Sequence, residues 1–202
     1  MRSEEVLRIL EGTGAVKRGH FRLASGRHSD VYAQKFRVLE RPKLARDLGA
    51  AIAGEFENGF DVVASPAVGA VILGFATALA AGARFVFTER IDGSMTFRRG
   101  FQVKPHERVL VVEDVVTTGG SVREVLDLVR PAGAPIVGVG ALIDRTARGS
   151  APDFGVPLRA LLRLDAEAWE ESECPLCRAQ EPLSDPGSSR VTASSSLPEK
   201  GG

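Results

Sequence analysis

The segment Val109-Leu-Val-Val-Glu-Asp-Val-Val-Thr-Thr-Gly-Gly-Ser121 constrains the fold of this chain most strongly. Its first four residues are apolar, which predicts a strand buried on both faces of a parallel sheet. Two acids, Glu113 and Asp114, follow at the expected end of that strand. A helical apolar stripe begins at Val122, directly after a turn of hydroxyl and glycine residues. The segment therefore predicts a strand, a turn and a helix N-terminus.

A turn of this composition suits a phosphate group. The free N–H groups of the first helical turn and the positive end of the helix dipole favour an anion, and glycines let the backbone approach it closely. Unlike the nucleoside-triphosphate P-loop, the segment has no Lys after its glycines. The dinucleotide-binding fingerprint has no acid pair before its turn. We therefore expect a phosphate ester of a diol, whose hydroxyls donate hydrogen bonds to the two carboxylates.

This pattern resembles the phosphoribosyl-pyrophosphate motif of the type I phosphoribosyltransferases. An ordinary strand–turn–helix with a solvated acid pair is the alternative, and it leaves the density of Thr, Gly and Ser unexplained. In the family, the loop at Ser65-Pro-Ala-Val-Gly69 receives pyrophosphate, and many relatives have Lys where this chain has Gly69. The residues that the resemblance implies for phosphoribosyl pyrophosphate are Glu113, Asp114, Val115, Val116, Thr117, Thr118, Gly119, Gly120, Ser121, Ser65 and Arg90.

A second motif, Phe21-Arg-Leu-Ala-Ser-Gly-Arg-His-Ser29, precedes the first by about ninety residues. Its residues alone predict a hairpin that turns at Ser25-Gly26. Together with the first motif, it resembles the hood of the orotate phosphoribosyltransferases, which lies over the pyrimidine and gives it backbone hydrogen bonds. Ser25 and Gly26 are therefore implied to bind orotate. Many members have Lys in place of Ala24.

Asp144-Arg145 corresponds to the position where this family keeps an Arg for the orotate carboxylate. A bidentate guanidinium–carboxylate pair would orient an acidic substrate and select it. Thr117 matches the family's Thr near the pyrimidine and the ribose phosphate. The alternative for Arg145 is a simple exposed salt bridge to Asp144.

Residues 90–99 are implied to form a mobile lid. Family members often carry Lys and His there, whereas this chain has neither and instead has Arg90, Arg98 and Arg99. We expect these arginines, with Asp114, to be the catalytic residues. The alternative is that the arginines are only solvent-exposed residues of a loop. Residues 91–107 have a polar composition that predicts such an irregular segment.

The remaining pattern alternates strands and helices. Helices are expected at residues 3–12, 42–56 and 68–81, and strands at 61–66, 85–88 and 136–143. This alternation predicts an α/β fold with a doubly wound parallel sheet of the type I phosphoribosyltransferase kind, together with a small hood and a mobile lid. Polar pairs at the strand ends predict one charged cleft there. Gly138 and Gly140 predict close strand–helix packing.

Three segments are expected. Residues 1–165 form the phosphoribosyltransferase domain with its hood, 166–180 a C-terminal segment, and 181–202 a disordered tail rich in Ser, Pro and Gly. Cys174 and Cys177 are either two reduced thiols in a turn or half of a Cys₄ zinc site shared across a dimer axis. A second Cys pair is missing from the chain.

The resemblance implies transfer of the phosphoribosyl group from phosphoribosyl pyrophosphate to orotate, with Mg²⁺ bound through the substrate and a homodimer whose lids reach neighbouring sites. A purine phosphoribosyltransferase would share residues 113–121 but lack the hood and Arg145. A non-catalytic regulator that senses phosphoribosyl pyrophosphate is the other alternative. The net charge of zero argues against nucleic acid. The charged first ten residues and the lack of a long apolar run predict a cytoplasmic protein without membrane association.

Overall fold

The computed structural model describes residues 1–23, 25–146 and 152–186. By its contacts the chain divides into two units. The first combines Met1–Lys17 with Ala33–Ala166, and the second combines Arg18–Tyr32 with Glu167–Gly202. The hood segment was expected in one domain with the rest of residues 1–165. Its contacts instead place it with the C-terminal segment.

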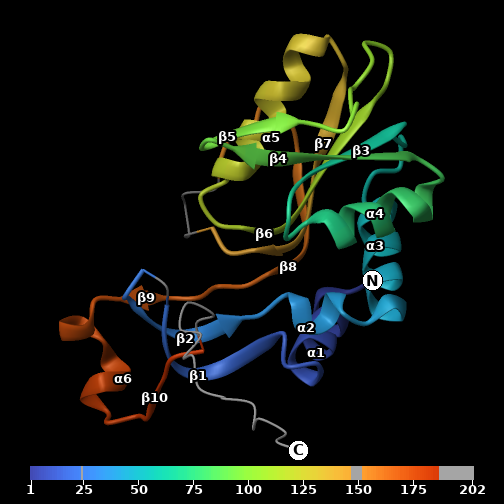
Figure 1. The fold of residues 1–202 in the computed structure, drawn as a ribbon. Coiled ribbons are helices and arrows are strands. Elements are labelled where there is room, and N and C mark those ends of the chain that lie inside the picture. Colours follow the sequence, from blue (N-terminus) through green and yellow to red (C-terminus); the bar gives the residue numbers. More distant parts are fainter. Residues whose placement is uncertain (24, 147–151, 187–202) are drawn as a thin grey trace, which may run out of the picture. The chain divides into compact units, whose positions relative to one another are not determined.

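The first unit contains a six-stranded sheet in the order β5-β4-β3-β6-β7-β8 (Figure 1). Its strands are β3 (Val62–Pro66), β4 (Arg84–Ile91), β5 (Ser94–Phe97), β6 (Val109–Val116), β7 (Ile136–Asp144) and β8 (Leu158–Arg163). Five strands run parallel, and β5 pairs antiparallel with β4 at the edge. The predicted parallel α/β sheet is confirmed. Strand β8 was not predicted.

The first unit contains the helices α1 (Ser3–Gly12), α2 (Phe36–Leu39), α3 (Pro42–Gly54), α4 (Val71–Ala81) and α5 (Gly120–Val129), with a 3₁₀ turn at Arg130–Ala132. Helices α1, α3, α4 and α5 pack against strands of the six-stranded sheet, and α2 packs against α3. The predicted apolar stripe of α5 joins the buried cluster that contains Val109 and Val111 of the central strand. Pro42 starts α3, and Gly82 ends α4 in the left-handed conformation that glycine accepts most easily.

Close packing of β7 against α3 explains the two glycines of that strand. A Cβ atom at Gly140 would lie 2.6 Å from Cγ2 of Ile52, and one at Gly138 would lie 2.5 Å from Cε1 of Phe56. Both distances are below any ordinary contact, so a side chain at Gly140 would push α3 away from the sheet, and one at Gly138 would displace Phe56, which follows that helix. This confirms the predicted packing role of Gly138 and Gly140.

Two local predictions are corrected. Strand β6 does not end before the acid pair but continues through Glu113 and Asp114 to Val116, because the β7 ladder continues beside it to Asp144. Residues 91–107 are also less irregular than predicted. Strands β4 and β5 form a hairpin that turns at Asp92 and Gly93, both of which have positive φ angles.

The second unit is built on a small sheet in the order β10-β1-β2-β9. Its strands are β1 (Val16–Arg22), β2 (His28–Ala33), β9 (Ala168–Trp169) and β10 (Leu183–Ser184), and short helical turns lie at Glu171–Glu173 and Pro175–Arg178 (α6). The predicted turn is present: the Gly26 N–H donates to the Leu23 carbonyl at 2.9 Å.

The tail needs a further correction. Disorder was expected from residue 181, but Leu183–Ser184 pairs with β1, so order extends further along the chain. Residues 187–202, and Ala24 of the hood, lie outside the described residues. In the described part of the chain, no helix has the length and apolar character needed to cross a membrane.

Candidate active site

The predicted phosphate-binding turn joins β6 to α5. Gly119 adopts φ 77°, and a Cβ atom there would lie 2.7 Å from Cζ of Phe154, so only glycine fits without displacing that ring. Thr117 and Thr118 are exposed, and no side chain caps α5. A cavity of about 240 Å³ surrounds the turn and is lined by Glu113, Val115, Val116, Thr117, Thr118, Gly119, Gly120, Ser121, Val122 and Glu124. The turn thus offers helix-terminal N–H groups and hydroxyls to an anion.

The acid pair is buried rather than solvated, with Glu113 only 9% and Asp114 only 2% exposed. Burial, followed by the neighbouring Asp114 charge, raises the pKa of Glu113 to about 8. The backbone N–H of Asp114 donates to Oε1 of Glu113 at 2.9 Å. Near neutral pH, Glu113 is therefore mainly protonated.

Lys35 faces Asp114 and was not predicted. Its Nζ lies 2.6 Å from Oδ2 of Asp114, and Lys35 follows β2 just before α2. A Cβ atom at Gly69 would lie 2.2 Å from this carboxylate oxygen and 2.5 Å from the Lys35 Nζ. The chain therefore places an ammonium group beside the position where many relatives have Lys. Nothing in the local sequence around Lys35 signals this contact.

The Ser65 side chain lies against α4, at the start of the loop predicted to receive pyrophosphate. The residue is fully buried, and its Oγ lies 2.1 Å from where a Cβ on Gly74 of α4 would stand. Alternation along β3 directs this side chain toward the helix, so only the backbone of Ser65 can serve the neighbouring loop.

The three arginines predicted to belong to a lid, Arg90, Arg98 and Arg99, have different surroundings. Arg90 donates to Oε1 of Glu124 at 2.7 Å, and Glu124 lines the cavity at the turn. Arg99 pairs with Glu89 through two hydrogen bonds of 3.1 Å. These contacts raise the pKa of both guanidinium groups. Arg98 is exposed and makes no ion pair with any described residue.

Arg145 lies beside the turn between β6 and α5. Its backbone N–H donates to the Val116 carbonyl at 2.8 Å, immediately before Thr117. Burial lowers the pKa of its guanidinium, and within the described ranges no carboxylate forms an ion pair with it. The alternative of a salt bridge to Asp144 is wrong, since Asp144 pairs instead with Arg163 at 2.9 Å. Arg145 is thus a half-buried cation left available to an acidic ligand.

The hood residues Ser25 and Gly26 are exposed at the hairpin turn of the second unit. The two cysteines belong to this unit as well. Cysteine spacing alone predicted either a turn of free thiols or a site completed by a second subunit. The structure instead brings two histidines of the same chain, His20 and His28, to Cys174 and Cys177.

Comparison with known proteins agrees with this geometry. Residues 37–158 match the phosphoribosyl transferase domain family. The orotate phosphoribosyltransferase of Caldanaerobacter subterraneus is 44% identical over 192 residues, covering 95% of this chain and 100% of that protein. The enzyme of the same name from Thermotoga maritima is 48% identical over 182 residues, covering 89% and 96%.

Among solved structures, orotate phosphoribosyltransferase from Aeropyrum pernix superposes with a TM-score of 0.65 at 27% identity, covering 79% of this chain and 93% of that one. The relatives match across nearly their whole length, so both the hood and the strand-end motif lie within the shared region. The chain therefore belongs to the orotate phosphoribosyltransferase family of type I phosphoribosyltransferases.

Proposed function

We propose that this protein transfers the 5-phosphoribosyl group from phosphoribosyl pyrophosphate to N1 of orotate, giving orotidine 5′-phosphate and pyrophosphate. The observation that carries this proposal is the half-buried Arg145 beside the phosphate-binding turn, without an acid partner among the described residues. Such a cation selects an acceptor with a carboxylate, which orotate has and the purine bases lack.

In this reaction the bond from the anomeric carbon to pyrophosphate breaks, and a bond to N1 forms while N1 loses its proton. The transition state has oxocarbenium character, so the protein's task is to position the substrates and to stabilise charge. The turn at residues 117–121 holds the 5′-phosphate. Arg145 and Thr117 orient orotate, with Ser25 and Gly26 of the hood as further contacts.

The acid pair binds the ribose diol with two different groups. Asp114 accepts a hydrogen bond from one hydroxyl, whereas the protonated Glu113 can both donate and accept. Lys35 holds the Asp114 carboxylate in place, and its ammonium lies beside the 65–69 loop proposed for pyrophosphate. Arg90, Arg98 and Arg99 are proposed to carry the remaining positive charge over the leaving group.

Mg²⁺ is proposed to bind with the substrate rather than in a protein cage. The acid pair is poorly suited to bind a metal ion directly, because Glu113 is mainly neutral and Asp114 already faces an ammonium. The same two groups are well suited to bind the hydroxyls of a diol. The cation would neutralise pyrophosphate charge and reach the protein through the ribose hydroxyls that Glu113 and Asp114 bind.

A homodimer is proposed, and the surface of α4 supports it. Three large apolar residues on this helix, Ile72, Phe75 and Leu79, are 41%, 56% and 63% exposed. Their spacing places them on one face of the helix, and Val68, just before α4, is 77% exposed. Sedimentation of wild type and of Phe75→Glu tests this surface, and a wild-type monomer at micromolar concentration would exclude it.

The activity is tested by following the loss of orotate absorbance with purified protein, Mg²⁺ and phosphoribosyl pyrophosphate. We expect turnover with orotate and none with uracil, adenine or hypoxanthine. Turnover with a purine base would establish the purine alternative instead. Binding of phosphoribosyl pyrophosphate without turnover of any base would establish a sensor.

A further inference from the structure

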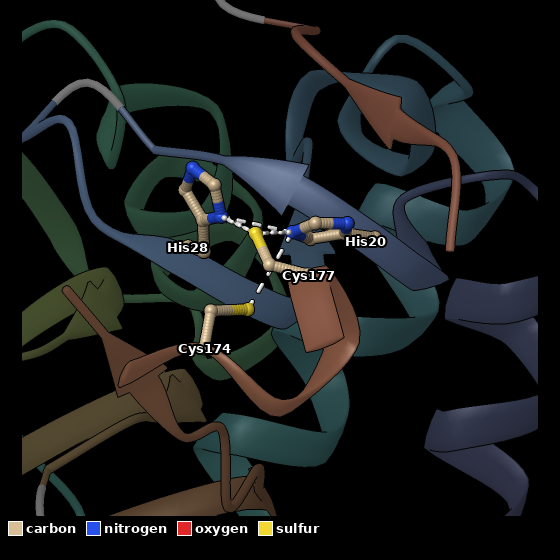
Figure 2. A group of neighbouring side chains, drawn as sticks. All are labelled: His20, His28, Cys174 and Cys177. Atoms are coloured by element: carbon tan, nitrogen blue, oxygen red, sulfur yellow. Dashed lines mark hydrogen bonds between the residues drawn. The ribbon is translucent and has the colours of Figure 1, made fainter. Parts of the chain in front are cut away.

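Four potential metal ligands converge inside the second unit (Figure 2). His20 and His28 come from neighbouring strands of the hood hairpin, while Cys174 and Cys177 flank the start of α6. One ligand atom from each lies within 4.8 Å of every other. These four are both cysteines of the chain and two of its three histidines.

The distances suit one tetrahedral ion. His20 Nε2 lies 2.9 Å from His28 Nδ1 and 3.5 Å from Cys174 Sγ, and Cys177 Sγ lies 3.2 Å from His28 Nδ1. Zinc bonds of about 2.0–2.1 Å to nitrogen and about 2.3 Å to sulfur separate tetrahedral ligand atoms by about 3.3–3.8 Å. The widest separation among the four atoms, 4.8 Å, would have to shorten by about an ångström for all four to bind one ion.

A second contact fixes the tautomer of one histidine. His20 Nδ1 lies 2.9 Å from the carbonyl oxygen of Glu181, which can only accept a hydrogen bond. The proton therefore sits on Nδ1, and Nε2 turns its lone pair toward the cluster. A histidine that binds a metal through one nitrogen and donates to a carbonyl through the other is the usual arrangement around zinc.

The composition of the unit's interior gives a reason for a metal. The described residues of this unit are 18–23, 25–32 and 167–186, and small units with little apolar core are often stabilised by disulfides, metals or association. Among these residues the buried apolar side chains are Phe21 and Val31, besides Cys174 itself. His20 and His28 are 5% and 0% exposed, so imidazole and thiol groups fill much of the interior.

We propose that His20, His28, Cys174 and Cys177 bind one structural Zn²⁺ within a single chain. Two thiolates and two imidazoles are a donor set that favours zinc, and four protein ligands leave no open position for catalysis. The ion joins the hood hairpin to the C-terminal segment. This site is independent of the proposed transferase activity.

The test uses the full-length chain with its purification tag removed. We expect about one zinc per chain by elemental analysis, and near none in His28→Gln and Cys177→Ser. His106→Gln is the matched control, because His106 is the third histidine and is exposed. Reduced metal-free protein should take up one Co²⁺ and develop the visible bands of a tetrahedral thiolate site.

If the variants fail to fold, hydrogen exchange of the wild-type protein still tests the proposal. Chelation should accelerate hydrogen exchange in residues 18–32 and 167–186 while strands β3, β6 and β7 keep their protection. Three results would overturn the proposal: zinc content in His28→Gln equal to that in His106→Gln, a Cys174–Cys177 disulfide in freshly isolated protein, or reduced protein that binds neither zinc nor cobalt.

Discussion

The ammonium of Lys35 lies 2.6 Å from the carboxylate of Asp114, in space left open by Gly69. Asp114 is nearly fully buried, whereas Lys35 is about a third exposed. The pair therefore sits at the boundary between the sheet and the candidate site. The Lys35 ammonium contacts one oxygen, Oδ2, of this carboxylate.

Asp114→Asn should lower kcat/KM by about 100-fold or more, because a hydrogen bond to a buried charge is worth about 1.5–3 kcal/mol and its ammonium partner is also lost. Circular dichroism should show that the fold survives. Asp127→Asn, on the exposed face of α5, is the control. Unchanged kinetics in a folded Asp114→Asn protein would remove the diol-binding role.

Lys35→Met should raise KM for phosphoribosyl pyrophosphate by about tenfold, since it removes a cation worth about 1–2 kcal/mol from the proposed pyrophosphate side. The KM for orotate should change much less. The exposed Lys43→Met serves as the control. If Lys35→Met and Lys43→Met behave alike, the pair has no part in substrate binding.

Glu113 makes stability depend on pH in a defined direction. Its pKa rises from 4.5 to about 8 on folding, so the folded state holds one more proton than the unfolded state between these values. This contribution is fully present below pH 4.5 and is lost as pH rises toward 8. The free energy of unfolding should therefore fall by up to about 1.4 kcal/mol per pH unit in that window.

Glu113→Gln keeps the shape of the protonated acid and cannot ionise. Urea unfolding of the ligand-free proteins across this pH range should show a shallower decline for the variant. Parallel curves for the two proteins would mean that Glu113 ionises normally in the fold.

Arg145→Ala should lose about 2–3 kcal/mol of transition-state binding, as expected when one member of a buried charged pair is removed. The loss should appear in kcat/KM for orotate and be much smaller in the affinity for phosphoribosyl pyrophosphate. Arg159→Ala is the control, because Arg159 is half exposed on β8 and has only a distant acid partner at 3.9 Å. Equal weakening of both substrates would make Arg145 structural or phosphate-directed.

The hairpin of β4 and β5 should be protected from trypsin by phosphoribosyl pyrophosphate with Mg²⁺. A lid that closes over substrate loses mobility on binding, and the exposed Arg98 is the natural cleavage site. Fragment masses after timed digestion give the rate at this bond, with cleavage after the exposed Arg178 as the internal reference. Equal rates at Arg98 with and without ligand would exclude the lid.

The sequence by itself determined the features that depend on neighbouring residues. The β-branched run of β6, the Thr-Thr-Gly-Gly turn and the apolar stripe of α5 predicted the phosphate-binding turn, because each of these is a local backbone preference. The alternation of strands and helices likewise predicted the parallel sheet, and Gly138 and Gly140 its close packing against α3.

Tertiary structure decided which distant side chains meet. No short-range sequence pattern indicates that Lys35 contacts Asp114. Nor does any such pattern indicate that Asp144 forms its ion pair with Arg163 and not with its neighbour Arg145. Because β6 pairs with β7 along its whole length, the strand continues through Glu113 and Asp114. Both acids are therefore buried in the sheet, and this burial raises the pKa of Glu113. Cysteine spacing could not reveal that His20, 154 positions away along the chain, lies beside Cys174 in the folded second unit. Such contacts depend on how strands and loops assemble, and short-range sequence patterns carry no record of that assembly.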